Sequence, residues 1–177
     1  MSTSPRTRRR SRDAWLAAAL LLIGAGSAAA KAMDLRCSLT APASVATGES
    51  VPLRFSLANR GTVAVQVLEW GTPFEGWFAA YVEVLRDGVA VPYRGPMVKR
   101  GEPAADEYVR IAARRARHAE VDLAQPFDLS GPGVYRVRPR ITLFDVMGAD
   151  APAPRPRARH VALALSCPEF EVRVEAR

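Results

Sequence analysis

Apolar and polar residues alternate with a period of two along most of the chain after residue 34. In the stretch SVPLRFSL the alternation places Val51, Leu53, Phe55 and Leu57 on one face. Side chains of a β-strand point to opposite faces in turn, so this pattern predicts half-buried strands with one wet face. The same pattern recurs in TVAVQVLEW, YVEVL, VYRVRPRITLF, HVALALS and FEVRVEA.

Turn sequences separate these stretches. They include ATGES, ANRGT, RDGVA and SGPGV, and VEVLRDGVAVPY is typical of a β-hairpin around Arg86–Gly88. We therefore expect an all-β fold, an immunoglobulin-like antiparallel β-sandwich, with a barrel as the alternative. Eight or nine strands are predicted, near residues 34–40, 50–58, 62–69, 78–86, 89–93, 107–111, 117–123, 133–143 and 161–174.

Two long segments interrupt the rhythm of the strands. Arg94–Tyr108 is rich in turn-forming residues, and Gly148–His160 alternates Pro with Ala and Arg. The second is expected to be an exposed, extended Pro/Arg-rich loop that leaves the core undisturbed. No internal repeat is visible, so residues 31–177 are predicted to form a single domain.

The first 30 residues have the organisation of a secretory signal peptide: a basic RTRRRSRD, an apolar AWLAAALLLI and a small-residue GAGSAAAKA. Cleavage is expected after Ala30 or Ala32, and the apolar run is short for a membrane anchor. The leader contributes +4 of the net charge of +7, so the remaining +3 gives no reason to expect nucleic-acid binding. We expect an exported protein, periplasmic or secreted, with no stable membrane anchor once the leader is removed.

The chain has two cysteines, Cys37 and Cys167, which flank nearly the whole predicted domain. Export places them in an oxidising compartment, where a disulfide persists. We predict that they are bridged, on the expectation that the first and last strands lie side by side.

No catalytic motif appears in the chain. His118 and His160 are not part of an H-E-x-x-H, and their spacing from the cysteines lacks the paired ligands of structural zinc. There is no nucleophile elbow and no phosphate-binding glycine loop after the leader. The expectation is a protein without enzymatic activity, without a bound metal and without a cofactor.

The stretch LEWGTPFEGWF, which we call the aromatic loop (Leu68–Phe78), holds two of the three Trp and two of the six Phe. Trp70 and Phe74 are predicted to plug one end of the sandwich. Exposed aromatic residues are enriched in interfaces, and alternation places one of Trp77 and Phe78 inward and the other outward. The candidate partner-binding residues are Trp77, Phe78, Tyr93, Lys99, Arg100 and Tyr108.

The order of several short stretches resembles the non-catalytic amino-terminal, pro-segment-like region of secreted deuterolysin-type (aspzincin) metalloendopeptidases, including lysine-specific ones. These stretches are EWGTPFEGWF, RDGVAVPYRGPMVKRGEPAADEYV and EVDLAQPFDLSGPGVYRV. The protease domain of that family, with its H-E-x-x-H, does not follow, so no protease residue is carried over. The resemblance implies a module that inhibits or assists the folding of a secreted metalloprotease. The alternative is a general envelope or secreted interaction domain without a protease link.

Overall fold

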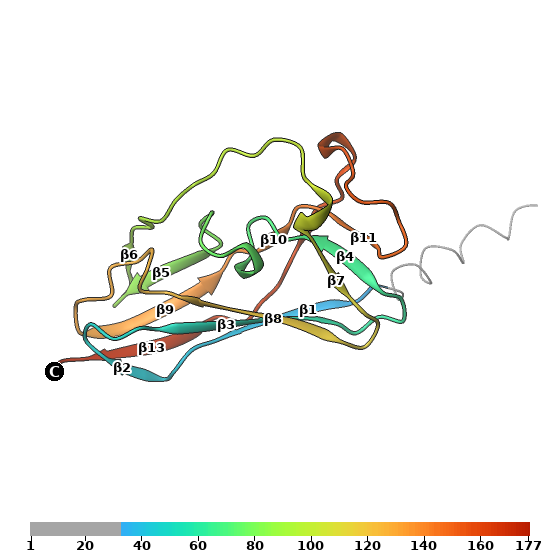
Figure 1. Cartoon of the computed structure of the whole chain (residues 1–177). Coiled ribbons are helices and arrows are strands. Elements are labelled where there is room, and N and C mark those ends of the chain that lie inside the picture. The colour runs from blue at the N-terminus through green and yellow to red at the C-terminus, as the bar shows by residue number, and fades with distance from the viewer. Residues whose placement is uncertain (1–32) are drawn as a thin grey trace, which may run out of the picture.

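The computed structural model describes residues 33–177, and the signal peptide predicted for residues 1–30 lies outside them. The described chain is an all-β, immunoglobulin-like sandwich with three short 3₁₀ helices (Figure 1). Its strands are β1 (Leu35–Thr40), β2 (Ser44–Ala46), β3 (Pro52–Asn59), β4 (Val65–Leu68), β5 (Val82–Arg86), β6 (Val89–Val91), β7 (Tyr108–Ile111), β8 (Ala116–Asp122), β9 (Gly133–Pro139), β10 (Thr142–Leu143), β11 (Val146–Gly148), β12 (Leu163–Ala164) and β13 (Phe170–Glu175). The predicted fold class is confirmed.

Two sheets form the two layers of the sandwich. One has the strand order β1-β3-β8 and the other β2-β13-β9-β5-β6, and all neighbours are antiparallel except β2 and β13. The chain changes sheet between β1 and β2. The core between the layers holds the inward side chains of β3, which are fully buried, together with those of β5, β9 and β13: Leu53, Phe55, Leu57, Val82, Val84, Tyr135, Val137, Val172 and Val174.

Tyr135 in β9 ties the five-stranded sheet to the turn that precedes it. Its ring is buried, and its hydroxyl donates to the carbonyl oxygen of Gly131 at 2.7 Å, four residues upstream. A tyrosine that bonds back in this way at the start of a strand is a hallmark of immunoglobulin-like sandwiches.

A second group of short strands forms one end of the molecule, away from the C terminus (Figure 1). Strands β11, β4 and β7 make a three-stranded sheet, and β10 pairs with β12. Buried Asn59 joins this end to the sandwich, because its amide nitrogen donates to the carbonyl oxygens of Val63 at 2.8 Å and of Ile111 at 3.3 Å.

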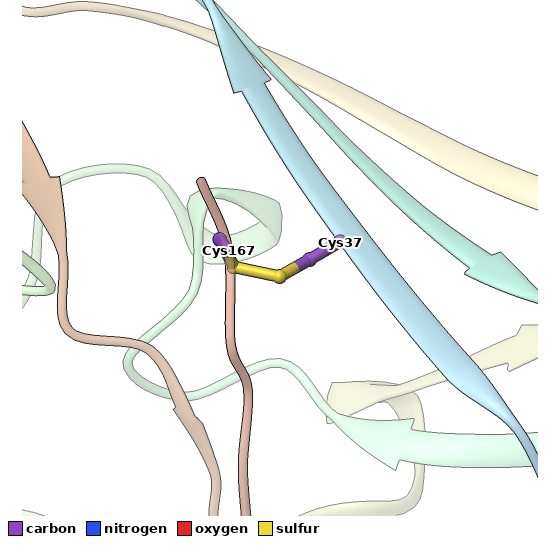
Figure 2. The surroundings of a disulfide bond; sticks show 2 residues. All are labelled: Cys37 and Cys167. Atoms are coloured by element: carbon purple, nitrogen blue, oxygen red, sulfur yellow. A yellow bond between two sulfur atoms is a disulfide. The ribbon is translucent and has the colours of Figure 1, made fainter. Parts of the chain in front are cut away.

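The structure contains a disulfide between Cys37 and Cys167, with the two Cα atoms 5.2 Å apart (Figure 2). The bridge was predicted on the expectation that the first and last strands lie side by side, and this expectation was wrong. Cys37 lies in β1, but Cys167 lies in the connection between β12 and β13, and β1 and β13 belong to different sheets. The bridge therefore joins the first strand of one layer to the chain that enters the other layer.

Candidate functional site

The aromatic loop is a tightly bonded turn. After β4, the Thr72 hydroxyl donates to the carbonyl oxygen of Glu69 at 2.6 Å and accepts from the Phe74 amide at 3.2 Å. Thr72 thus caps the 3₁₀ helix η1 (Pro73–Glu75), which has proline in its first turn, where the missing amide hydrogen costs nothing. Gly71 and Gly76 adopt positive φ angles of 67° and 82°, a region that favours glycine.

Trp70 is buried by this turn rather than by the main core. Its side chain is 5% exposed, and its indole Nε1 donates to the Glu107 carboxylate at 2.8 Å. The Arg100 guanidinium covers its ring at 5.1 Å from the centroid, a cation–π arrangement. Phe74, in contrast, is half-buried against the core with its ring edge-on to Phe55 at 5.1 Å.

Trp77 is the aromatic residue that fills the core. It stacks on Tyr81 at 4.5 Å, meets Phe127 edge-on at 6.1 Å, and donates from Nε1 to the carbonyl oxygen of Asp122 at 2.9 Å. At 7% exposure it is not available to a partner, so its place among the candidate contact residues was wrong. Phe78 is 45% exposed, which confirms that one ring of the pair faces in and the other out.

Arg100 and Glu75 form the ionic centre of the site. They make an ion pair in which the Glu75 side chain is only 4% exposed. Burial raises the pKa of Glu75, although hydrogen bonds from the Gly71 amide and Arg100 act in the opposite direction. The ion pair fastens the Arg94–Tyr108 connection, which contains Arg100, to the aromatic loop, which contains Glu75.

Two further carboxylates lie near this pair. Burial, together with the negative charges of Glu75 and Glu107, raises the pKa of Glu69. Hydrogen bonds from the Ala104 amide and from the Trp70 indole outweigh the effect of burial and lower the pKa of Glu107. Glu69, Glu75 and Glu107 therefore form an acidic cluster near Trp70, and the positive charge of Arg100 offsets part of their negative charge.

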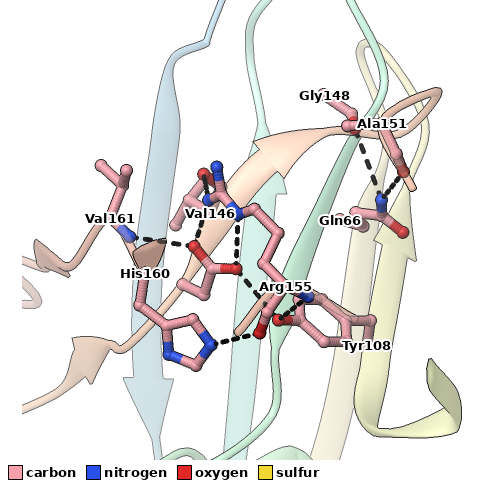
Figure 3. Close-up of polar contacts among 9 residues, drawn as sticks. Gln66, Tyr108, Val146, Gly148, Ala151, Arg155, His160 and Val161 are labelled. Atoms are coloured by element: carbon pink, nitrogen blue, oxygen red, sulfur yellow. Dashed lines mark hydrogen bonds and ion pairs between the residues drawn. The ribbon is translucent and has the colours of Figure 1, made fainter. Parts of the chain in front are cut away.

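The Gly148–His160 loop contains no fully buried residue, as expected of an exposed segment, but it is anchored at its centre (Figure 3). Arg155 donates from Nε to Asp145 at 3.0 Å and from Nη2 to the carbonyl oxygen of Val146 at 3.0 Å, and forms an ion pair with Asp145. The Asp145 side chain is fully buried and also accepts from the Tyr108 hydroxyl and the Val161 amide, each at 3.0 Å.

Asp145 stays a charged hydrogen-bond acceptor inside the fold. Burial by itself raises its pKa, but the hydrogen bonds from Arg155, Val161 and Tyr108 together prevail and lower it. The loop and the Arg94–Tyr108 connection are joined again where the Arg157 amide donates to Glu102 at 2.9 Å and its guanidinium to the Arg100 carbonyl oxygen at 2.9 Å. The two long segments that interrupt the strand pattern therefore pack against each other.

These three segments enclose a pocket of about 380 Å³, which we call the apolar pocket. Its volume lies in the range of small-ligand and side-chain sites, roughly 300–1,000 Å³. The residues that line it come from the aromatic loop, from the Arg94–Tyr108 connection and from the chain around β10 to β12: Trp70, Gly71, Glu75, Phe78, Ala79, Val98, Arg100, Phe144, Arg157, His160 and Ala162.

The structure places some of the predicted partner-binding residues at the pocket and others away from it. Phe78 and Arg100 line the pocket, and Lys99 is exposed beside it in the chain. Tyr93 instead packs on Phe127 at 5.6 Å, and Tyr108 donates to Asp145, so these two tyrosines do not line the pocket.

Sequence reasoning missed Phe144, Arg157 and His160 as site residues. A signal was present in the stretch ITLFDVM, where Asp145 is the one charged residue in a mostly apolar sequence. A charge in such a stretch needs a partner, because a buried unpaired carboxylate is costly. That partner, Arg155, is the residue that brings its neighbours to the pocket.

The described residues offer no arrangement for metal chemistry. Across residues 33–177 no three His, Cys, Asp or Glu side chains gather as a metal site, and both cysteines are bonded to each other. In the same residues, no helix combines the length and the apolar character needed to cross a membrane. The pocket combines the aromatic side chains of Trp70, Phe78 and Phe144 with the charged side chains of Glu75, Arg100 and Arg157 and the ring of His160.

Comparison with known proteins finds a similarity to part of an extracellular protease. The chain is 30% identical over 122 residues to an extracellular protease of Aeromonas hydrophila, a match that covers 68% of this chain and 34% of that protein. The chain thus spans about a third of the length of the protease it matches. No protein-family model matches the chain.

Solved structures share only a distant likeness. A CARDB domain from Pyrococcus furiosus, solved in complex with di-metal ions, is 13% identical with a TM-score of 0.37, covering 81% of this chain and 94% of that one. A β-glucosidase mutant from Listeria innocua is 15% identical with a TM-score of 0.30, covering 79% and 16%. At these scores the likeness says nothing of function.

Proposed function

We propose that this chain is an exported, non-catalytic module that binds a secreted metalloprotease as its inhibitor or folding partner. The observation that carries the proposal is the similarity to one third of an extracellular protease. It agrees with the resemblance of the stretches around Trp70 and Gly88 to the pro-segment-like region of deuterolysin-type enzymes. Residues 31–177 then form one domain that acts on a protease supplied by another chain or by a further part of the same protein.

The disulfide and the leader support the export part of the proposal. Cys37 and Cys167 are bridged in the structure, and such bridges persist outside the cytosol. Removal of the leader is expected to leave a chain that starts at Lys31 or Met33. Mass spectrometry of the exported protein measures this start directly, and an intact Met1 on folded, exported protein contradicts it.

The protease link is tested by capture followed by activity measurement. The exported chain is immobilised and exposed to culture supernatant and periplasmic extract from the cells that make it, and bound proteins are identified by mass spectrometry. A captured protease is then mixed with increasing amounts of the free chain. We expect either stoichiometric inhibition of casein cleavage or a higher yield of active protease on refolding.

Two results contradict the protease proposal. One is that no protease is captured, and the other is that a captured protease is unaffected in both assays. Capture of envelope components instead of a protease favours the alternative, a general envelope or secreted interaction domain.

A further inference from the structure

The apolar pocket is lined by several large apolar side chains that are exposed to solvent. Phe78, Val98 and Phe144 are 45%, 45% and 46% exposed, and all three line the same hollow. Met97 and Val161, next in the chain to lining residues, are 77% and 57% exposed. Exposed apolar residues scattered singly need no explanation, but a cluster around a pocket marks an interaction site.

Close packing of the residues around the apolar pocket keeps its shape. The Phe144 ring lies against Gly71, so closely that a Cβ added there would come within 2.8 Å of Phe144 Cε2. Buried Trp70 supports the floor, and the Arg100–Glu75 ion pair closes one side. A hollow built from bonded segments keeps its shape, so a ligand spends little binding energy in forming it.

The charge of the rim favours an acidic ligand. The charge of Arg100 is balanced by Glu75, but Arg157 forms no ion pair anywhere in residues 33–177. Its guanidinium donates to a single protein acceptor, the Arg100 carbonyl oxygen, and the nearby Glu102 carboxylate is engaged by the Arg157 amide. His160 adds a second polar group to the same lining.

We propose that the apolar pocket receives one bulky apolar side chain of a protein partner, and that an Asp or Glu next to it in the partner's sequence pairs with Arg157. This inference rests on the proposed function only in taking a protein as the partner. The apolar walls bury the inserted side chain, an aromatic ring bringing about 150–250 Å² of surface. In a fully extended segment neighbouring side chains point to opposite faces, so the bound segment turns between the two residues, which lets the carboxylate reach the rim while the first side chain fills the hollow.

The inference is tested by NMR titration of the ¹⁵N-labelled exported protein with three small probes: acetyl-Phe-Asp-amide, acetyl-Phe-Lys-amide and acetyl-Gly-Asp-amide. We expect the Phe-Asp probe to shift the amide resonances of Gly71, Ala79 and Ala162, which line the pocket. It should half-saturate at a concentration about two- to fivefold lower than the Phe-Lys probe, the range of an exposed ion pair, and the difference should shrink in high salt. The Gly-Asp probe should leave these resonances unchanged.

Two variants with a matched control locate the binding. Ala162→Trp fills the pocket and is expected to abolish the shifts, whereas Ala164→Trp, at an exposed position of β12 outside the lining, should leave them. Arg157→Glu reverses the charge of the rim and should make the Phe-Lys probe the stronger ligand. Unchanged one-dimensional spectra confirm that each variant is folded.

Three results overturn the inference: no pocket shift with any probe at millimolar concentration, equal half-saturation by Phe-Asp and Phe-Lys, or an unchanged order in Arg157→Glu. These results concern the isolated chain. If the pocket binds the probes as expected but no protease is captured, the proposed function is contradicted and the inference about the pocket stands. If a protease is captured but the pocket does not bind the probes, the inference is contradicted and the proposed function stands.

Discussion

Arg155 forms an ion pair with Asp145, a fully buried carboxylate ten residues earlier in the chain. The pair fastens a Pro-rich segment, of the kind that is ordinarily a mobile surface loop, to the end of the β-sandwich. Tyr108 bonds to the same carboxylate, so one buried acidic residue holds both long connections that frame the apolar pocket.

Arg155→Ala is expected to lower the free energy of unfolding by about 3–5 kcal/mol, because it leaves the Asp145 charge buried without its partner. Arg159→Ala is the matched control: it removes an exposed arginine four residues further on whose side chain forms no ion pair or hydrogen bond in residues 33–177, and it should change the stability by less than about 0.5 kcal/mol. Urea unfolding of the two variants measures the difference. Equal stability of both variants contradicts an anchoring role for Arg155.

The stability of the protein should fall in acid through Asp145. Its folded pKa lies below its ordinary value, so its stabilising contribution is present above the unfolded pKa, near 3.9. The contribution is lost as the pH falls through the folded pKa, that is, below about pH 4. Urea midpoints between pH 2.5 and 6 should therefore drop more steeply for the native protein than for Asp145→Asn. Parallel pH profiles are the result that argues against this.

Removal of the disulfide should be the most destabilising single change to the sandwich. Cys37 and Cys167 are 130 residues apart in sequence, and closing a loop of this length stabilises by about 5 kcal/mol in the entropic model. The Cys37→Ala/Cys167→Ala variant should melt many degrees below the native protein. Labelling of the native, unreduced protein with a thiol reagent should find no free thiol, and two reactive thiols would refute the bridge.

The aromatic residues should differ in their effect on stability. Trp77→Ala empties a stacked core position and should cost about 3–5 kcal/mol. Phe78→Ala removes a half-exposed ring and should cost less than about 0.5 kcal/mol. Trp70→Ala should fall between them, because Trp70 lies outside the main core but carries the bond to Glu107. Thermal melting ranks the three, and a Phe78→Ala variant that melts as early as Trp77→Ala shows that the outward ring is structural.

Glu69→Gln should raise the melting temperature at neutral pH. The folded pKa of Glu69 is raised, so its charge opposes folding, and this cost grows as the pH rises above its unfolded pKa, about 4.3. The gain from the neutral side chain should be at most about 1 kcal/mol, because the side chain is only partly buried and solvent screens its charge. It should vanish below pH 4, where the native carboxyl is already neutral. A gain that persists in acid points to a cause other than charge.

The sandwich was predictable because its strands are amphipathic. In β3 every second residue enters the core, and the alternation of Leu53, Phe55 and Leu57 shows this directly in the sequence. Strands β10 and β12, of two residues each, leave no such signal and exist through their pairing with each other. The predicted strand over residues 161–174 is accordingly divided between β12 and β13.

The pocket was only partly predictable. Alternation requires Trp77 and Phe78 to face opposite ways but does not say which one enters the core, because that depends on the position of Tyr81 and Phe127. Composition favoured an exposed loop at Gly148–His160, and no local pattern pairs Arg155 with Asp145. Contacts of this kind are set by tertiary packing, which overrides local preference.

The position of the disulfide has a consequence for cleavage of the chain by peptidases. Any single cut of the backbone between residues 37 and 167 yields two fragments that remain covalently joined through Cys37 and Cys167. A nick after Lys99 or Arg100, in the connection beside the apolar pocket, would pass unnoticed on a non-reducing gel and separate only after reduction. The two halves also remain interleaved within one sheet, because β9 and β13 from the second fragment pair with β2 and β5 from the first. The bridge thus gives the fold tolerance to cleavage as well as stability against unfolding.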